Sequence, residues 1–369
     1  MASGTTEPIS RPRCFSALLT SLSNGLAQFL SESPPLKGQA AGAAADHNPE
    51  KFRSLVARSG EALAHEANKM AIAFKVEPLP APEETRTMCA EVEQKTVLLL
   101  SLYLSLSPDC GKHLLTTVAR LCSGAVAALV DLVKLLEARE SAATAFDEYE
   151  EAVLQSVGKV WEKCDALAKS VPATNSECCS KLMSTHRTLV SDATKELEDA
   201  LRLASDEDSE KQDRKDDEDE DSFCPGETWS PPEKLLIPPG VGLLKTAAAL
   251  LKKVAETVEK SKPPDGASFG AMNTEIDNVT DLCLLISPVA DDLCWSLYAP
   301  IDRDSMLETG DKLRGTLQEV LSFIQNHQIL RSGGQYEKWG DFLGKALQHN
   351  WTKLNEVDCE AKIESLKVN

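Results

Sequence analysis

The sequence predicts an all-α protein of two antiparallel helix bundles joined by an acidic, disordered linker. Leu and Ala are abundant while aromatic residues make up only 5% of the 369 residues, a balance that favours helix bundles over β-sandwiches or barrels. Apolar residues recur at three-, four- and seven-residue spacing through long segments, which is typical of amphipathic helices. The run 206–221 contains eleven carboxylates, three basic residues and no apolar residue. It cannot bury enough apolar surface to offset the entropy of ordering.

These patterns divide the chain into four expected parts. They are an N-terminal segment with one short helix (1–49), an N-terminal helix bundle (50–204), an acidic linker rich in Pro, Asp and Glu (205–228) and a C-terminal helix bundle (229–369).

Five or six helices are expected before the acidic run. Their approximate ranges are 18–30, 49–76, 82–106, 112–138, 146–169 and 176–203. Three prolines within residues 77–85 break the second helix, and Pro82 followed by two Glu residues makes a favourable first turn for the next. The helix 82–106 is apolar on several sides towards its end, which is typical of a helix at the centre of a bundle.

Four helices are expected after the acidic run, enough for a four-helix bundle. Their approximate ranges are 243–258, 273–298, 306–325 and 336–367. The prolines between residues 225 and 239 are expected to lie outside continuous helix. Pro288 lies in the middle of the second of these helices, where it marks either a kink or a fresh, capped helix start.

The charge distribution favours basic partners. The net charge is −19, and residues 1–204 (21 basic, 26 acidic), 205–221 (3 and 11) and 222–369 (15 and 21) are all acidic. Direct binding to nucleic acid is therefore not expected, whereas proteins with basic patches are favoured partners.

The cysteine pattern and the apolar stretches bear on the cellular compartment. Eleven cysteines, an odd number without a disulfide framework, indicate reduced thiols and a cytoplasmic or nuclear protein. No secretory signal is evident at the start. The most apolar stretch, 97–106, is too short to span a bilayer, so no membrane association is expected.

No catalytic, cofactor or metal constellation is evident, so the sequence predicts a protein that is not an enzyme and binds no cofactor. Residues 266–270 match a nucleophile elbow in letters only, because that motif needs a preceding strand. Residues 240–246 resemble the end of a phosphate loop but lack the Gly before Lys245. Both are interpreted as structural segments.

Two short motifs bear on binding and regulation. Leu132–Leu136 fits the LxxLL pattern by which helices dock into grooves, but the same spacing serves a helix that buries its own face, and the core interpretation is favoured. Ser205 is followed by three carboxylates. It is the candidate phosphorylation site of the chain, for an acidic-directed kinase.

Three stretches in order carry a family resemblance: EANKMAIAFKVEPLPAPEET (66–85), TWSPPEKLLIPPGVGLLKTAAALLKKV (228–254) and IDNVTDLCLLISPVADDLCWSLYAPID (276–302). They resemble the D-type-cyclin-interacting protein (GCIP) family, over about residues 50–137 and 228–330. The resemblance implies helix bundles similar to those of the talin rod. It also implies a helix-loop-helix-like protein without a basic region, which resides in nucleus and cytoplasm.

The resulting hypothesis is a non-enzymatic regulatory binding protein. The resemblance implies that it engages D-type cyclins and other helical transcription regulators, and that it negatively regulates cell-cycle progression and transcription controlled by the retinoblastoma protein. The alternative is a cytoskeletal or adhesion adaptor built from talin-like bundles. That alternative calls for an exposed basic actin-binding helix, which the acidic second half disfavours.

Overall fold

The computed structural model describes residues 14–32, 48–75, 78–140, 146–213, 229–262, 268–327, 330–331 and 336–368. The chain divides into two compact units, residues 1–175 (unit 1) and 176–369 (unit 2). Every regular element within the described ranges is a helix, so the predicted all-α fold is confirmed. Most of the predicted acidic linker, residues 214–228, lies outside the described residues.

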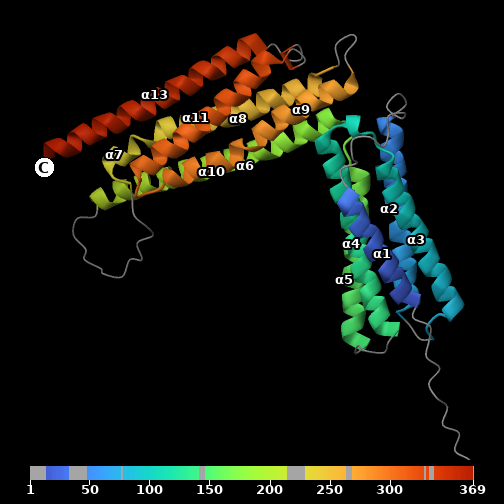
Figure 1. The fold of residues 1–369 in the computed structure, drawn as a ribbon. Coiled ribbons are helices and arrows are strands. Elements are labelled where there is room, and N and C mark those ends of the chain that lie inside the picture. The colour runs from blue at the N-terminus through green and yellow to red at the C-terminus, as the bar shows by residue number, and fades with distance from the viewer. Residues whose placement is uncertain are drawn as a thin grey trace, which may run out of the picture. The chain divides into compact units, whose positions relative to one another are not determined.

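Unit 1 contains five α-helices in its described part, coloured blue to green in Figure 1. They are α1 (Cys14–Glu32), α2 (Pro49–Ala73), α3 (Pro82–Leu104), α4 (Lys112–Glu140) and α5 (Phe146–Ser170), with a short 3-10 helix, η1 (Pro108–Cys110), before α4. The Asn48 side chain accepts a hydrogen bond from the Lys51 amide at the start of α2, and Pro82 opens α3. Both features are typical helix starts.

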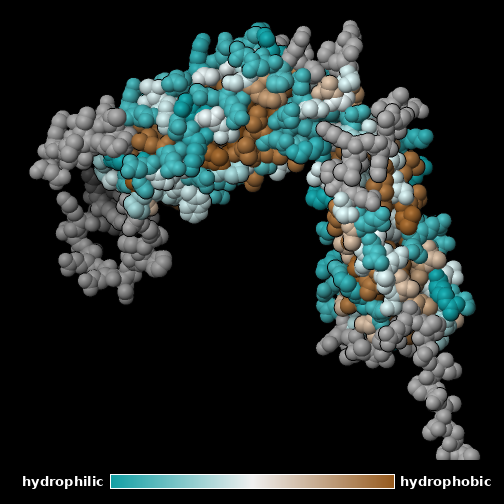
Figure 2. Space-filling view, in the orientation of Figure 1, coloured by the Kyte–Doolittle hydropathy of each residue, from teal (hydrophilic) through white to brown (hydrophobic). Residues whose placement is uncertain are grey.

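The central helix of unit 1 is α4, which contacts all four of the other α-helices. Its buried apolar residues cover the helix except for one exposed stripe, which runs from Thr116 to Lys134. The buried residues include Leu115, Val118, Cys122, Ala125, Leu129, Leu132, Val133 and Leu136. The sequence assigned the centre to α3, and that prediction is wrong. Val97, Leu98 and Leu104 on α3 are exposed, and Figure 2 shows apolar residues reaching the surface over α2 and α3. The spacing of apolar residues in the sequence shows that a helix has an apolar face, but not whether a neighbouring helix covers that face.

Helix α1 packs into unit 1 instead of forming a separate N-terminal segment. It contacts α3 and α4. The ring centroids of Phe15 and Phe74 lie 4.9 Å apart, as do those of Phe29 and Tyr103. Edge-to-face pairs of this kind add to the stabilisation that burial provides. The first bundle therefore begins with α1, and not at residue 50 as the sequence predicted.

Unit 2 contains the remaining helices (Figure 1). They are α6 (Asn175–Asp213), α7 (Pro231–Lys234), α8 (Ile237–Lys260), α9 (Phe269–Leu284), α10 (Ile286–Ser296), α11 (Arg303–Asn326) and α13 (Tyr336–Val368). Helix α8 contacts α10, α11 and α13, and α11 also packs against α9, α10 and α13. Their inward faces form one continuous apolar core.

Helix α6 belongs to this second core. Its buried residues Cys179, Met183, Val190 and Leu197 join the apolar cluster of α8–α13. The predicted boundary at residue 204 therefore differs from the observed one at 175/176. Helix α6 also continues to Asp213, eight residues into the acidic run that was expected to lack structure. Each added residue contributes a backbone hydrogen bond once a helix is nucleated, so a packed helix can extend into polar sequence.

Several prolines of unit 2 lie in the first turns of helices, including Pro231 and Pro232 at the start of α7, which were expected to lie outside helix. Helix α8 begins at Ile237, so Pro238 and Pro239 lie in its first turn, contrary to the expectation that they lie outside helix. The first-turn amides have no intrahelical acceptor, and proline is therefore tolerated there. Helix α9 ends at Leu284 and α10 begins at Ile286. Pro288 thus falls in the first turn of α10. The N-cap residue Leu285 has helical backbone angles and makes no side-chain cap hydrogen bond, so the alternative of a capped start is not confirmed.

One helical stretch in the described part of the chain is long and apolar enough to cross a membrane by length and composition. It is Pro231–Lys260, with a hydropathy of 1.4 in its most apolar window. Of that window, 61% is buried inside the unit. The apolar composition is therefore explained by packing in the core of unit 2.

Candidate interaction surface

The most exposed large apolar side chain among the described residues is Trp295 on α10, which is 77% exposed. Its ring centroid lies 5.9 Å from that of Tyr298, and the Tyr298 ring lies 6.1 Å from that of Trp229. Trp229 itself is buried. The three rings form a ladder that leads from the core of unit 2 to solvent.

Hydrogen bonds hold the inner end of this ladder. The indole N–H of Trp229 donates to the backbone oxygen of Leu297 at 2.8 Å. The Glu233 carboxylate in α7 accepts from the backbone amide of Ile301 and from that of Ser230, both at 2.7 Å. Burial raises the pKa of Glu233, but a hydrogen bond from the Ser230 hydroxyl and those from the two amides outweigh burial and lower the pKa below its ordinary value. The segment that follows α10 is thereby fixed against α7.

Carboxylates surround the outer end of the ladder. Asp291 and Asp292 precede Trp295 by four and three residues on α10, so they share its side of the helix. Burial raises the pKa of Asp291, and the charge of Asp292 raises it further. Burial also raises the pKa of Tyr298, and electrostatic interactions with Cys294 and Glu196 raise it further. We call the surface formed by Trp295, Tyr298, Asp291, Asp292 and Glu196 the Trp295 patch.

Trp295 is not among the predicted site residues, although the sequence contains a signal for it. The buried residues Ile286, Ala290, Leu293 and Leu297 of this segment recur every three or four positions, which defines the face of α10 that packs inward. Trp295 lies off that stripe. An aromatic residue outside the apolar stripe of an amphipathic helix is a candidate for contact with a partner.

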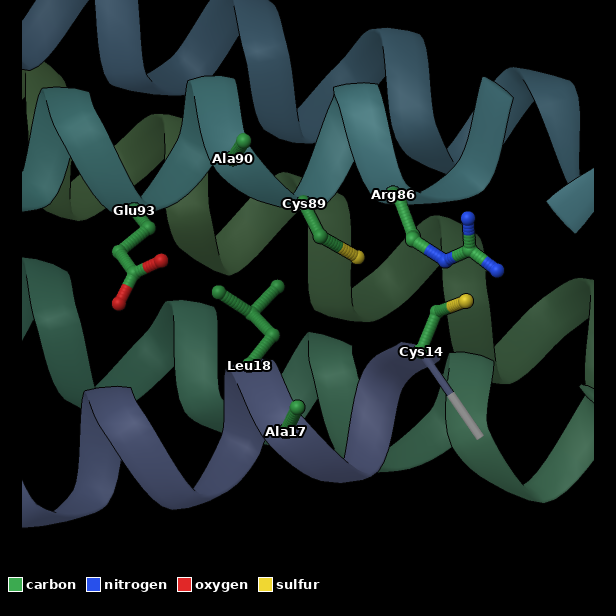
Figure 3. Close-up of a pocket in the computed structure, with 7 residues that line it drawn as sticks. All are labelled: Cys14, Ala17, Leu18, Arg86, Cys89, Ala90 and Glu93. Atoms are coloured by element: carbon green, nitrogen blue, oxygen red, sulfur yellow. The ribbon is translucent and has the colours of Figure 1, made fainter. Parts of the chain in front are cut away.

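Unit 1 has a groove between α1 and α3, with a cavity of about 410 Å³ (Figure 3). Its lining residues are Cys14, Ala17, Leu18, Arg86, Cys89, Ala90 and Glu93. The Cys14 thiol points to the Pro82 carbonyl oxygen at 3.8 Å, Ser21 donates to Glu93, and Arg86 is ion-paired with Glu83. These contacts hold the polar groups of the groove to one another or to the adjacent backbone.

The two motifs with catalytic resemblance are structural. Ser268 is the N-cap of α9, and its hydroxyl accepts a hydrogen bond from the Ala271 amide at 3.1 Å. The residues 240–246 lie inside α8, where Gly240 meets the Leu297 side chain. Lys245 is ion-paired with Glu198 at 2.7 Å. Residues 240–246 are therefore helical and form no phosphate loop, whereas residues 266 and 267 of the other motif lie outside the described residues.

The remaining motifs have different outcomes. Leu132 and Leu136 are fully buried in α4, so the core interpretation of the LxxLL pattern is confirmed. The nine cysteines whose side chains are described are free thiols. Ser205 lies within α6, but its side chain lies outside the described ones, and its phosphorylation stays a prediction.

The fold and the Trp295 patch define a class: an all-α protein of two helix bundles, with an exposed aromatic and acidic surface suited to contact with another macromolecule. Two family models match the chain. They are the N-terminal model "Grap2 and cyclin-D-interacting" (GCIP) over residues 55–203 and its C-terminal counterpart over 214–322. The chain belongs to the GCIP family.

Curated relatives match over most of their length. A Cyclin-D1-binding protein 1 homolog of Xenopus laevis is 27% identical over 315 residues, which cover 84% of this chain and 90% of the relative. The homolog of Danio rerio is 25% identical over 306 residues, which cover 83% of this chain and 86% of the relative. Cyclin-D1-binding protein 1 of Homo sapiens is 25% identical and covers 87% and 88%.

The family division and the structural division of the chain do not coincide. The N-terminal family model ends at residue 203 and so includes most of α6. The compact unit that contains α6 nevertheless begins at Ser176. Fragments cut at the family boundary therefore separate α6 from the core that it completes.

Proposed function

We propose that this chain is a regulatory binding protein that engages a D-type cyclin. The observation that carries the proposal is the ordered match of both GCIP family models, together with relatives that bear the name Cyclin-D1-binding protein 1. The proposed mechanism is non-enzymatic: a helical surface of this chain covers a surface of the cyclin that another partner needs.

Occupation of the cyclin would then negatively regulate cell-cycle progression and transcription controlled by the retinoblastoma protein. Other helical transcription regulators are proposed as further partners, in the nucleus and in the cytoplasm. The charge of unit 2 supports a partner with a basic surface. Residues 176–369 contain 22 basic and 37 acidic side chains, a net of −15 of the total −19.

The test is a binding measurement with purified D-type cyclin against the full chain, residues 1–175 and residues 176–369, at low and moderate salt. These fragments follow the observed unit boundary. We expect the full chain to bind and one of the two fragments to retain binding. Binding that survives moderate salt indicates a packed interface, because exposed charge pairs more than a Debye length apart are screened. Failure of the full chain to bind at either salt concentration overturns the proposal.

We also propose that Ser205 is phosphorylated. The motivation is the three carboxylates that follow it, and phosphate would add about two negative charges to an acidic segment. The full chain would be incubated with an acidic-directed kinase and mapped by mass spectrometry, with Ser205→Ala as the control. Phosphate on other serines with none on Ser205 would exclude this assignment.

A further inference from the structure

We propose that the Trp295 patch is the docking surface of unit 2 and that its occupant is a partner-protein segment with a Lys or Arg side chain beside an apolar one. The inference rests on the proposed function, because it names the surface and the partner chemistry for a binding protein. Three independent features of the patch support it: exposure, rigidity and charge.

The first feature is the exposure of Trp295. The neighbouring apolar residues of α10 are directed into the core, whereas this indole remains 77% exposed. Trp is among the residues that contribute most to protein interfaces, because one side chain presents a large apolar area and a polar N–H group. Phe342 on α13 has a similar exposure of 69%, but no ring contact with a second aromatic residue is found for it in the described part of the chain.

The second feature is the support behind Trp295. Tyr298 packs between Trp295 and the buried Trp229, whose N–H is bonded to Leu297 O. Segment 229–236 is held in turn by the bond from the Ile301 amide to Glu233. A surface that is ordered before binding loses less conformational entropy when a partner arrives.

The third feature is the charge around Trp295. Asp291, Asp292 and Glu196 are in no ion pair with a described residue. The charge of Asp292 reaches Lys312, but the Lys312 ammonium is already 2.9 Å from Glu308. Burial is the largest cause of the raised pKa of Asp291, and repulsion by the charge of Asp292 raises it further. A cation placed here would relieve that repulsion.

The chemistry of the occupant follows from these groups. A guanidinium or ammonium group can lie over the Trp295 indole face while it bonds to an adjacent carboxylate. An apolar neighbour on the same segment can cover the rest of the ring. Phosphate-rich partners such as nucleic acid would be repelled by the same carboxylates. The patch therefore favours a basic, partly apolar protein segment.

The test uses the full chain and purified D-type cyclin, with affinity measured by calorimetry. We expect Trp295→Ala, and separately the pair Asp291→Lys with Asp292→Lys, to weaken binding at least tenfold. The matched controls are Phe342→Ala, an exposed aromatic residue on α13, and Glu319→Lys, an exposed carboxylate on α11. Both controls should remain within twofold of wild type. Circular dichroism checks that every variant is folded.

The outcomes separate the two proposals. If the wild-type chain binds the cyclin and Trp295→Ala changes the affinity less than twofold, the docking surface is overturned but the proposed function stands. Absence of wild-type binding overturns the cyclin proposal, and the patch is then tested with an amphipathic Leu/Lys helical peptide and its Leu/Glu counterpart. The patch is supported if the chain prefers the Leu/Lys peptide and only Trp295→Ala, not Phe342→Ala, abolishes that preference. It is overturned if both variants lose the preference equally. If the chain self-associates and Trp295→Ala abolishes that self-association, the occupant of the patch is a second copy of the chain and not a basic partner.

Discussion

The Nδ1 atom of His186 in α6 lies 2.7 Å from the Oγ atom of Ser287 in α10, 101 positions later in the chain. Ser287 is buried, so the contact lies where α6 meets the body of unit 2. The ion pair between Glu198 and Lys245 makes a second link between α6 and the later helices. These contacts show that α6 completes unit 2, although a stretch of acidic sequence separates it from α8.

We expect fragment 176–369 to unfold in one cooperative transition and fragment 222–369 to lose that transition. Met183, Val190 and Leu197 cover apolar faces of the later helices. Removal of α6 would expose those faces to water. Thermal unfolding followed by circular dichroism checks this expectation. Fragment 1–175 is the matched control, because unit 1 ends at Asn175. Equal transitions for 176–369 and 222–369 would contradict the assignment of α6 to this core.

A substitution inside α6 should destabilise unit 2 selectively. Met183 is fully buried in the unit 2 core, so Met183→Ala should lower the free energy of unfolding of fragment 176–369 by about 2–5 kcal/mol. The control Leu189→Ala removes a half-exposed side chain of the same helix and should cost less than about 1 kcal/mol. Urea unfolding of both variants makes the comparison, and similar losses would argue against the observed orientation of α6.

The stability of unit 2 should fall as the pH falls below 6.5, partly because of His186. Burial lowers the pKa of His186 from its ordinary value of 6.5. Protonation is thus easier in the unfolded chain, so the contribution to stability is present above pH 6.5 and is lost as the pH falls towards the folded-state pKa. Denaturant unfolding of fragment 176–369 at pH 7 and pH 5 measures the loss. His186→Gln should reduce it, and an unchanged loss in that variant would contradict the role of His186.

Gly111 should be intolerant of substitution. Its φ angle is +101°, in the region that favours glycine, and an added Cβ would meet the side chain of Asn175. That side chain accepts a 3.1 Å hydrogen bond from the Leu114 amide at the start of α4. Gly111→Ala should therefore lower the free energy of unfolding of unit 1 by about 1–3 kcal/mol. Gly158→Ala, in α5 with open space around it, should instead stabilise by about 0.5–1 kcal/mol.

The buried thiols should resist alkylation in the native protein. Burial raises the pKa of Cys122 and of Cys164 to about 12, and burial also raises the pKa of Cys283. The thiolate is the reactive form, so native-state labelling with iodoacetamide at pH 7.5 should be slow at all three sites. Peptide mass spectrometry before and after addition of urea measures the difference. Fast native labelling of any one of them would contradict its buried position.

Local sequence patterns determined the helical class and most helix positions. The recurrence of Phe52, Val56, Leu63 and Met70 every three, four or seven residues predicted α2, and the prolines within 77–85 predicted where the chain turns into α3. These features depend on the periodicity of one helix and on backbone groups a few residues apart. The same holds for the structural role of Ser268, because a helix cap is a local contact.

The tertiary structure alone decided which bundle each helix joins and which apolar side chains remain in solvent. Met183 of α6 reaches a core that residues between 229 and 354 also form, and Phe15 of α1 pairs with Phe74, the C-cap residue of α2. An amphipathic pattern states that a helix has an apolar face, but the choice of partner depends on how faces from distant parts of the chain fit together. For the same reason the exposure of Val97 on α3 and of Trp295 on α10 became evident only when the neighbouring helices were in place.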